Sequence, residues 1–132
     1  MSEANCIFCQ IIKKEIPKKI IYEDKKYIVF EDIHPRAPIH VLIVPKKHIV
    51  SLVEATKKDK TLINGLMWQT KILAEKLGID KSGYKLILNC GRGAGQIVDH
   101  IHLHLLGGGN YKDWGIYQHS KEGEILSKVF QV

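Results

Sequence analysis

The sequence predicts an α+β domain in which helices pack against an antiparallel sheet. Residues 62–77 place apolar side chains on one helix face, and shorter runs rich in β-branched and aromatic residues lie between turn-forming residues. One such run, residues 98–106, alternates histidine with aliphatic residues at a period of two, as strands do. At 132 residues, 45% of them hydrophobic, the chain is long enough to bury one core, so we expect a single domain over residues 1–132.

The N-terminal part of the chain predicts one short helix and three strands. Apolar residues at helical spacing favour a helix over residues 6–12, which the next proline stops. Residues 20–22 and 27–30 are expected to form two strands that make a hairpin around a charged turn. After an extended segment marked by two prolines, residues 39–44 form a third strand that ends at Pro45.

A main helix follows. Thr56, with Asp59 three residues later, is typical of a helix start, and Gly78 ends the helical pattern. Met67 and Trp68 are expected to lie in the core or at a subunit contact. The apolar stripe of this helix comprises Leu62, Ile63, Leu66, Met67, Thr70, Leu73, Ala74 and Leu77.

Two further strands are predicted over residues 84–89 and 98–106. A glycine-rich loop, residues 91–95, lies between them, so the two strands are close enough in the chain to pair antiparallel. Together with the three earlier strands, they complete the sheet that the helices cover.

Charge and cysteine content limit the class of protein. The formal net charge is +6, but the lysines are dispersed near turns, which favours a solvated surface with a bias toward anionic substrates and no nucleic-acid partner. No run approaches the ~20 apolar residues that span a bilayer, and the first residues lack the basic start of an export signal, so we expect no membrane association and a cytoplasmic location. Three cysteines, an odd number, favour thiols or a metal site over disulfides.

Three histidines, His100, His102 and His104, are expected on one side of the last strand. A strand rises ~3.3 Å per residue, so the Cα atoms of His100 and His104 would lie roughly 13 Å apart. All three rings could meet one ion only in a nearly straight line, which tetrahedral zinc does not accept. A row of imidazoles instead suits a phosphorus centre, where one ring attacks while others donate hydrogen bonds or a proton.

The histidine run and its surroundings resemble the signature of the histidine triad family. Leu105-Leu106-Gly107-Gly108 follows the run, Asn89, Gly95 and Gln96 precede it at the family's usual spacing, and Asp32-Ile33-x-Pro35-x-Ala37-Pro38-x-His40 and Pro45-Lys46-Lys47-His48 stand upstream. The resemblance covers residues 6–114 and is greatest to the Hint-type branch, the nucleoside phosphoramidases, in a zinc-binding variant. It implies a five-stranded antiparallel sheet with one main helix and a short N-terminal helix, usually paired as a homodimer. The tail, residues 115–132, is not placed by the resemblance.

The resemblance implies roles for three histidines. His102 would attack phosphorus and form a covalent nucleotidyl-histidine, because a neutral imidazole is a competent nucleophile and a phosphohistidine is labile to water. A nearby backbone carbonyl would hold the other ring nitrogen protonated. His104 would contact the non-bridging oxygens or the leaving group, and His40 would be a supporting residue. His34 and His119 are expected at the surface.

The other matched positions would form the nucleotide site. The glycine-rich loop leaves backbone N–H groups free to approach a phosphate. A carboxylate at position 32 suits two vicinal ribose hydroxyls, although Asp32 also suits the cap of a turn. By resemblance, Asn89, Gly95, Gln96 and Ile97 lie on the phosphate side with His102 and His104, Asp32 holds the ribose, and Ile7, Phe8, Phe30 and Ile33 surround the base.

Cys6 and Cys9 have the spacing of a zinc knuckle. By resemblance, His48 and His100 complete a structural zinc site with them, and no catalytic metal is expected. Two thiolates and two imidazoles make a closed tetrahedral shell, which would anchor the N-terminal helix. The alternative is a pair of reduced, unligated thiols.

Two positions depart from the family's pattern. Ile97 stands where a serine often assists the departing nitrogen. Asp99 stands where an apolar or aromatic residue is usual, and the charge of Asp99 could support a zinc-bound His100.

Taken together, these features of the sequence predict a purine nucleotide hydrolase that cleaves a P–N or related bond of a nucleoside 5′-monophosphate. The alternatives are a dinucleoside polyphosphate hydrolase and a non-catalytic nucleotide-binding regulatory or scaffold protein.

Overall fold

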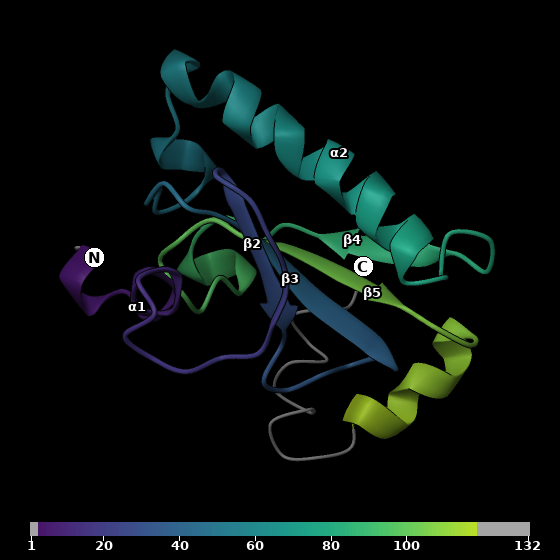
Figure 1. Ribbon diagram of the computed structural model, residues 1–132. Helices are drawn as coiled ribbons and strands as arrows, with labels where there is room; N and C mark the ends of the chain where they lie inside the picture. Colours follow the sequence, from purple (N-terminus) through teal and green to yellow (C-terminus); the bar gives the residue numbers. More distant parts are fainter. Residues whose placement is uncertain (1–2, 119–132) are drawn as a thin grey trace.

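The computed structural model describes residues 3–118, which form one five-stranded sheet with strand order β1-β2-β3-β5-β4 and every neighbouring pair antiparallel (Figure 1). The main elements are α1 (Ile7–Ile12), β1 (Ile20–Glu23), β2 (Tyr27–Glu31), β3 (Ile39–Pro45), α2 (Lys60–Lys76), β4 (Tyr84–Ile87) and β5 (Leu103–Gly107). The predicted α+β class, with a five-stranded antiparallel sheet, one main helix and a short N-terminal helix, is confirmed. His119 and the rest of the tail beyond residue 118 lie outside the described residues.

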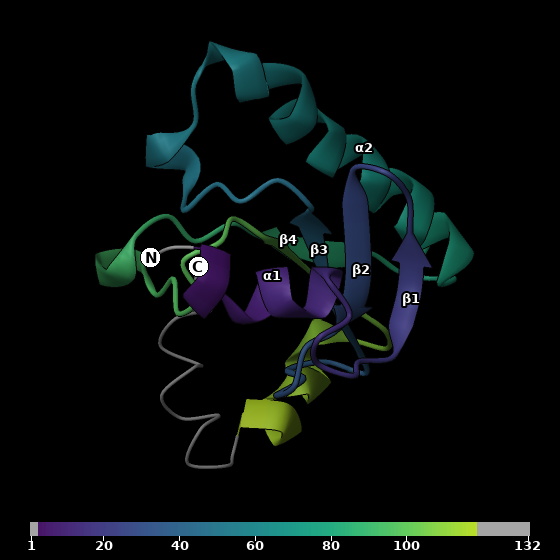
Figure 2. The same ribbon diagram turned by 60° about the vertical axis from the view of Figure 1, so that its left-hand side comes forward.

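The two helices cover opposite faces of the sheet (Figures 1 and 2). Successive side chains of a strand point to opposite sides, so a strand can contribute to the core under each helix. The face under α2 is built from Tyr27, Val29, Val41, Ile43, Leu103 and Leu105. The face under α1 is built from Ile28, Phe30, Leu42 and Val44. Leu42 is paired with His104 across β3 and β5, and His40 lies two residues before it, so both histidines share the α1 face. The alternation of the strands therefore brings two imidazoles to the side of the N-terminal helix.

The helix α2 begins and ends where its sequence indicates. Thr56 and Asp59 form a reciprocal capping box around a single 3₁₀ turn, from which α2 continues at Lys60. Gly78 follows the helix with φ of +74°, the left-handed conformation that glycine tolerates. No helix within residues 3–118 combines the length and the apolar run needed to cross a bilayer.

Two expectations about the elements are wrong. The last strand starts at Leu103 rather than at residue 98, and β4 ends at Ile87 rather than at residue 89. The segment before β5 makes other hydrogen bonds: the N–H of Ile101 donates to the carbonyl of Ile49, outside the sheet. His100 and His102 therefore lie on an irregular segment just before β5 and not within a regular strand.

Met67 and Trp68 do not lie in the core. Their side chains are 59% and 61% exposed, whereas Leu66 and Leu73 of the same helix are buried. The apolar stripe of α2 that faces the sheet is therefore narrower than the sequence indicates, because the helix turns Met67 toward solvent.

Gly65 makes close packing of α2 possible, and we expect Gly65→Ala to destabilise the fold. Alanine normally stabilises a helix interior by about 1 kcal/mol relative to glycine. Here, an added Cβ would lie 1.9 Å from the hydroxyl oxygen of Tyr27, which donates to the carbonyl of Leu62 at 2.7 Å. Displacing that buried hydroxyl costs about 1–3 kcal/mol. Urea denaturation measures the loss, and the double variant Gly65→Ala with Tyr27→Phe is expected to recover part of it; a more stable single variant would contradict the prediction.

Candidate nucleotide pocket and metal centre

A cavity of about 510 Å³ lies on the α1 side of the sheet. Its walls come from α1, β2, β3, β5, the segment just before β5, and the three loops that carry residues 16–18, 32–36 and 89–98. Of the residues predicted to bind a nucleotide, those that line it are Ile7, Phe8, Phe30, Asp32, Ile33, Asn89, Gly95, Ile97, His102 and His104. The apolar residues of this set come mainly from α1 and β2, and the polar ones mainly from the loops and from residues in or just before β5, so the cavity offers both kinds of lining.

The ring of His102 is held in one orientation. Its Nδ1 lies 2.7 Å from the carbonyl oxygen of His100, and because a carbonyl only accepts, Nδ1 carries the proton. Burial lowers the pKa of His102, so the ring stays neutral near pH 7. The Nε2 atom therefore keeps a free lone pair, and Phe8 packs edge-on against the ring with the two centroids 5.1 Å apart.

His40 and His104 form a hydrogen-bond relay next to the ring of His102. The backbone N–H of Arg36 donates to Nδ1 of His40 at 3.0 Å, so His40 carries its proton on Nε2. That nitrogen lies 2.9 Å from Nδ1 of His104, which must accept. Burial lowers the pKa of His40 to about 4 and holds that of His104 far below its usual range. Both rings are therefore neutral, and His104 carries its proton on Nε2.

The same tautomers argue against a metal ion at the relay. Asp32, His40 and His104 bring three possible ligand atoms within 4.8 Å of one another. However, the His40 nitrogen in this group is the protonated one, because its other nitrogen accepts from Arg36. A protonated imidazole nitrogen has no lone pair for a metal, so this trio is a hydrogen-bond network.

Asp32 has two environments. Its Oδ1 accepts from the N–H of His34 at 2.8 Å, as in the turn cap that the sequence left open. Its Oδ2 lies 3.5 Å from Nε2 of His40 and lines the cavity through a side chain that is 16% exposed. The turn cap and a role toward a ligand are therefore compatible.

Gln96 does not line the cavity. Its side chain is buried, and its Oε1 accepts from the N–H of Gly91 at 2.8 Å. Its Nε2 donates to the carbonyls of Val50 and Val98. This amide thus closes the glycine-rich loop from within, where it shapes the cavity wall instead of facing the cavity.

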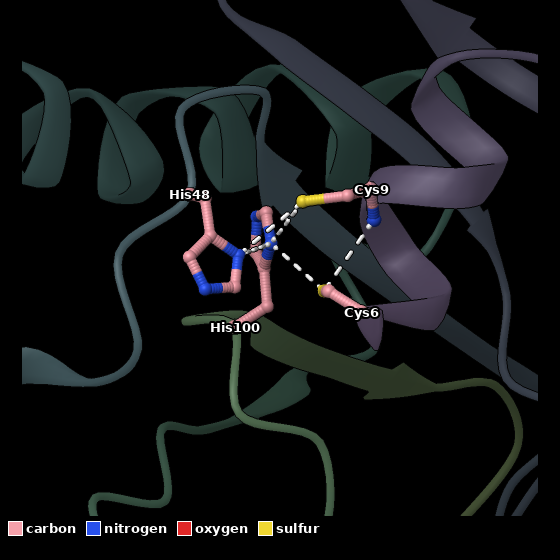
Figure 3. A group of neighbouring side chains, drawn as sticks. All are labelled: Cys6, Cys9, His48 and His100. Atoms are coloured by element: carbon pink, nitrogen blue, oxygen red, sulfur yellow. Dashed lines mark hydrogen bonds between the residues drawn. The ribbon is translucent and has the colours of Figure 1, made fainter. Parts of the chain in front are cut away.

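The two cysteines and two histidines predicted to bind a metal converge at the N-terminal end of α1 (Figure 3). Cys6 caps the helix by accepting from the N–H of Cys9, so both thiols point from one helical turn toward the segment before β5. Nδ1 of His100 lies 3.4 Å from Sγ of Cys6 and 3.5 Å from Sγ of Cys9, and Nδ1 of His48 lies 3.3 Å from Sγ of Cys9. All four possible ligand atoms lie within 4.8 Å of one another.

These separations fit a tetrahedral metal centre. Zinc bonds of ~2.3 Å to sulfur and ~2.05 Å to nitrogen would place sulfur and nitrogen ~3.5 Å apart and two nitrogens ~3.4 Å apart. The sulfur–nitrogen distances are 3.3–3.5 Å, and Nδ1 of His48 lies 3.2 Å from Nδ1 of His100. Nε2 of His100 lies 2.7 Å from the carbonyl oxygen of Pro45 and donates to it, which leaves the Nδ1 lone pair directed at the cysteines.

The donor set of the cluster also suits a cation. Burial, together with the Cys6 thiol, raises the pKa of Cys9 to about 12, and burial lowers the pKa of His100 to about 4. Two imidazoles beside two buried sulfurs form a donor set in which a divalent ion would replace the thiol protons. The residues therefore fit a closed metal site.

Several cavity residues were not predicted. His34 is exposed, as expected, and also lines the cavity, as do Lys18 and Arg36. Ile11, which lies one helical turn after Ile7 and Phe8, also lines it and could have been found from the helical period. Asp99 was expected to support His100, but it pairs with Arg92 at 3.0 Å.

Known proteins resemble this chain over most of its length. The family model described as "Scavenger mRNA decapping enzyme C-term binding" matches residues 5–116. The chain is 48% identical over 102 residues to an uncharacterized HIT-like protein of Buchnera aphidicola subsp. Baizongia pistaciae. The matched residues make up 77% of this chain and 91% of that relative. It is similar to a HIT family hydrolase from Legionella pneumophila Philadelphia 1, with a TM-score of 0.78, 45% identity and coverage of 80% of this chain and 95% of that one. A histidine triad nucleotide-binding protein from Candida albicans has a TM-score of 0.70, 36% identity and coverage of 95% and 99%.

Proposed function

Because this chain belongs to the histidine triad family, we propose that it is a purine nucleotide hydrolase that cleaves nucleoside 5′-phosphoramidates through a covalent nucleotidyl-His102 intermediate. The observation that carries the proposal is the hydrogen bond from Nδ1 of His102 to the carbonyl of His100. It fixes the tautomer with an unprotonated Nε2, the form that attacks phosphorus.

The reaction follows from the two fixed tautomers. Nε2 of His102 attacks phosphorus, and the bond from phosphorus to the leaving nitrogen breaks. The departing amine takes its proton from solvent, while the Nε2–H of His104, whose other nitrogen accepts from His40, donates a hydrogen bond that stabilises the charge developing on it. Water then attacks the nucleotidyl-histidine, the P–N bond to His102 breaks, the proton of the attacking water passes to solvent, and both rings end in their starting states.

The apolar and the polar side chains of the cavity suit, respectively, the base and the ribose phosphate of a nucleotide. Phe8 and Phe30 meet edge to face with centroids 5.4 Å apart and offer an apolar wall for a purine. Asp32 supports the ribose, and Asn89 with the glycine-rich loop supports the phosphate beside His102. The solved histidine triad relative named as nucleotide-binding supports this assignment.

We expect Asp32→Asn to weaken discrimination between ribose and deoxyribose. The amide keeps an oxygen for the N–H of His34 but loses the charge that strengthens hydrogen bonds from ribose hydroxyls, so kcat/KM should fall about 10-fold for adenosine phosphoramidate and much less for its 2′-deoxy analogue. Steady-state kinetics on both substrates measure the ratio. Glu31→Gln, which changes the neighbouring cavity carboxylate, should keep the wild-type ratio. Equal losses on both substrates would contradict the ribose role.

The Cys6, Cys9, His48 and His100 cluster is proposed to hold one structural zinc ion. With four protein ligands it would have no open position for water, so it would stabilise the N-terminal helix and the segment before His102 without taking part in hydrolysis. Reduced thiols suit a cytoplasmic location, which belongs to the same proposal.

A homodimer is also part of the proposal. Met67 and Trp68, consecutive residues of α2, both expose apolar side chains, and Nζ of Lys71 lies 5.6 Å from the centroid of the Trp68 ring. Aromatic residues and methionine are enriched at subunit contacts. Light scattering after gel filtration measures the mass, and a Trp68→Glu variant should shift a dimer to monomer; a monomeric wild type would exclude this part.

Intact-mass spectrometry tests the proposed reaction. The protein is mixed with adenosine 5′-phosphoramidate and quenched without acid, and a mass gain of one adenylyl group is expected. Parallel kinetics with diadenosine polyphosphates separate a phosphoramidase from a polyphosphate hydrolase. Tight AMP binding with neither an adduct nor turnover would instead favour a non-catalytic nucleotide-binding protein.

A further inference from the structure

The exposed guanidinium of Arg92 holds the outer side of the glycine-rich loop. Its Nη1 donates to the carbonyl of Ile97 at 2.5 Å and approaches that of Gln96 at 3.4 Å, while Nη2 donates to Oδ2 of Asp99 at 3.0 Å. Asp99 is only 23% exposed, so it is a better anchored partner than a fully solvated carboxylate. One side chain thus binds two successive carbonyls and the carboxylate that follows them.

Holding these carbonyls fixes the direction of the next two N–H groups. A trans peptide points its C=O and its N–H to opposite sides, and the chain has no cis peptide bond. With the carbonyls of Gln96 and Ile97 turned toward Arg92, the N–H groups of Ile97 and Val98 turn away from it. Within residues 3–118, neither N–H donates a hydrogen bond.

Both residues line the same cavity as His102. Two unsatisfied N–H groups from successive residues make a concave site for an anion. Such preorganised donors stabilise a phosphoryl group most when its oxygens gain charge as the nucleophile attacks.

The inner side of the loop is fixed by other contacts. Gln96 binds Gly91 and Val98 through its buried amide, and Gly91 and Gly95 have φ of +90° and +89°, which favour glycine. The loop is therefore held from inside by Gln96 and from outside by Arg92, and only the Arg92 contacts act directly on the carbonyls that precede the two N–H groups.

We propose that Arg92, locked by Asp99, is a positioning residue that aims the N–H groups of Ile97 and Val98 at the phosphoryl group of the substrate. The proposal rests on the proposed function for its catalytic part, but its binding part concerns only how the cavity recognises phosphate. Through its backbone N–H, Ile97 would then contact the phosphoryl group without the side-chain hydroxyl that a serine would supply.

Calorimetric titration with AMP and with adenosine tests the binding part without any turnover. We expect Arg92→Ala to weaken AMP binding about 10-fold and to leave adenosine binding within twofold of wild type, because only AMP presents a phosphate to the N–H pair. Lys71→Ala removes an exposed cation that also pairs with a carboxylate, but on α2, and should change neither. Equal effects on both ligands, or no effect on AMP, would overturn the proposal.

Asp99→Asn separates positioning from simple charge attraction. Removing this carboxylate makes the loop more positive, so charge attraction alone predicts tighter AMP binding, whereas loss of the lock predicts AMP binding about 3- to 10-fold weaker. For hydrolysis, Arg92→Ala should lower kcat about 10- to 100-fold with an unchanged Tm, and Arg92→Lys should recover part of that loss. Tighter AMP binding by Asp99→Asn would overturn the proposal. If the variants change AMP affinity as expected but wild type forms no adduct, the proposed hydrolase function is wrong and the phosphate-positioning role of Arg92 stands.

Discussion

The His102→Ala variant is expected to hydrolyse adenosine phosphoramidate on the order of 10⁴-fold more slowly than wild type or worse, while its affinity for AMP changes little. Among residues 3–118, the substitution removes the one ring whose Nε2 is left unprotonated by a hydrogen bond from Nδ1 to a backbone carbonyl, and the Nδ1 lone pair of His104 is occupied by His40. The apolar walls and Asp32, which are proposed to contact the nucleoside, are untouched. Steady-state kinetics and AMP titration measure the two effects separately.

His34→Ala is the matched control for this prediction. His34 also lines the cavity, but its known hydrogen bond runs through its backbone N–H to Asp32, so removing its ring should leave kcat within a fewfold of wild type. Intact-mass spectrometry should show the adenylyl adduct on wild type and on His34→Ala but not on His102→Ala. An adduct that survives on His102→Ala would place the covalent chemistry elsewhere.

The site was predictable where it depends on strand alternation. A period of two placed His104 on one face of its strand, and the same rule applied to residues 39–44 puts His40 on the face that meets it. The cysteine spacing was informative because one helical turn aims both thiols in the same direction. These are local rules that a single sequence contains.

The sequence predicted that a nearby backbone carbonyl holds the second ring nitrogen of His102 protonated, and this carbonyl is that of His100. The residue that supplies it and the tautomers of His40 and His104 were not predictable, because they depend on a backbone group distant in the fold or on the exact path of the chain. The Arg36 N–H reaches Nδ1 of His40 only because the preceding turn folds back, and His100 presents its carbonyl to His102 only because the segment leaves the regular strand conformation. The same irregular path explains why the predicted start of the last strand was wrong. The lock between Arg92 and Asp99 joins an exposed cation to a partly buried carboxylate, and the spacing of the two residues has no characteristic pattern.

Removal of one thiol from the metal cluster is expected to have the largest effect on stability. In Cys9→Ser, a hydroxyl replaces a thiolate, and the four-ligand shell of Cys6, Cys9, His48 and His100 loses a strong bond. A metal that binds only the folded state contributes about 4 kcal/mol when its free concentration is a thousandfold above its Kd. For a domain of this size, such a loss lowers the Tm by roughly 15 °C.

Calorimetry and elemental analysis of the same preparations test this prediction. Wild type should contain about one zinc per chain and lose thermal stability after chelation, whereas Cys9→Ser should contain much less and respond little to a chelator. Cys90→Ser is the matched control, because Cys90 lies outside the cluster and should keep both the zinc and the Tm. If Cys9→Ser retained the wild-type zinc content, or if chelation left the wild-type Tm unchanged, the four side chains would be a hydrogen-bonded cluster rather than a structural metal site. The His100 carbonyl that fixes the tautomer of His102 would then be positioned without a metal, by hydrogen bonds such as those from Nε2 of His100 to Pro45 and from the N–H of Ile101 to Ile49.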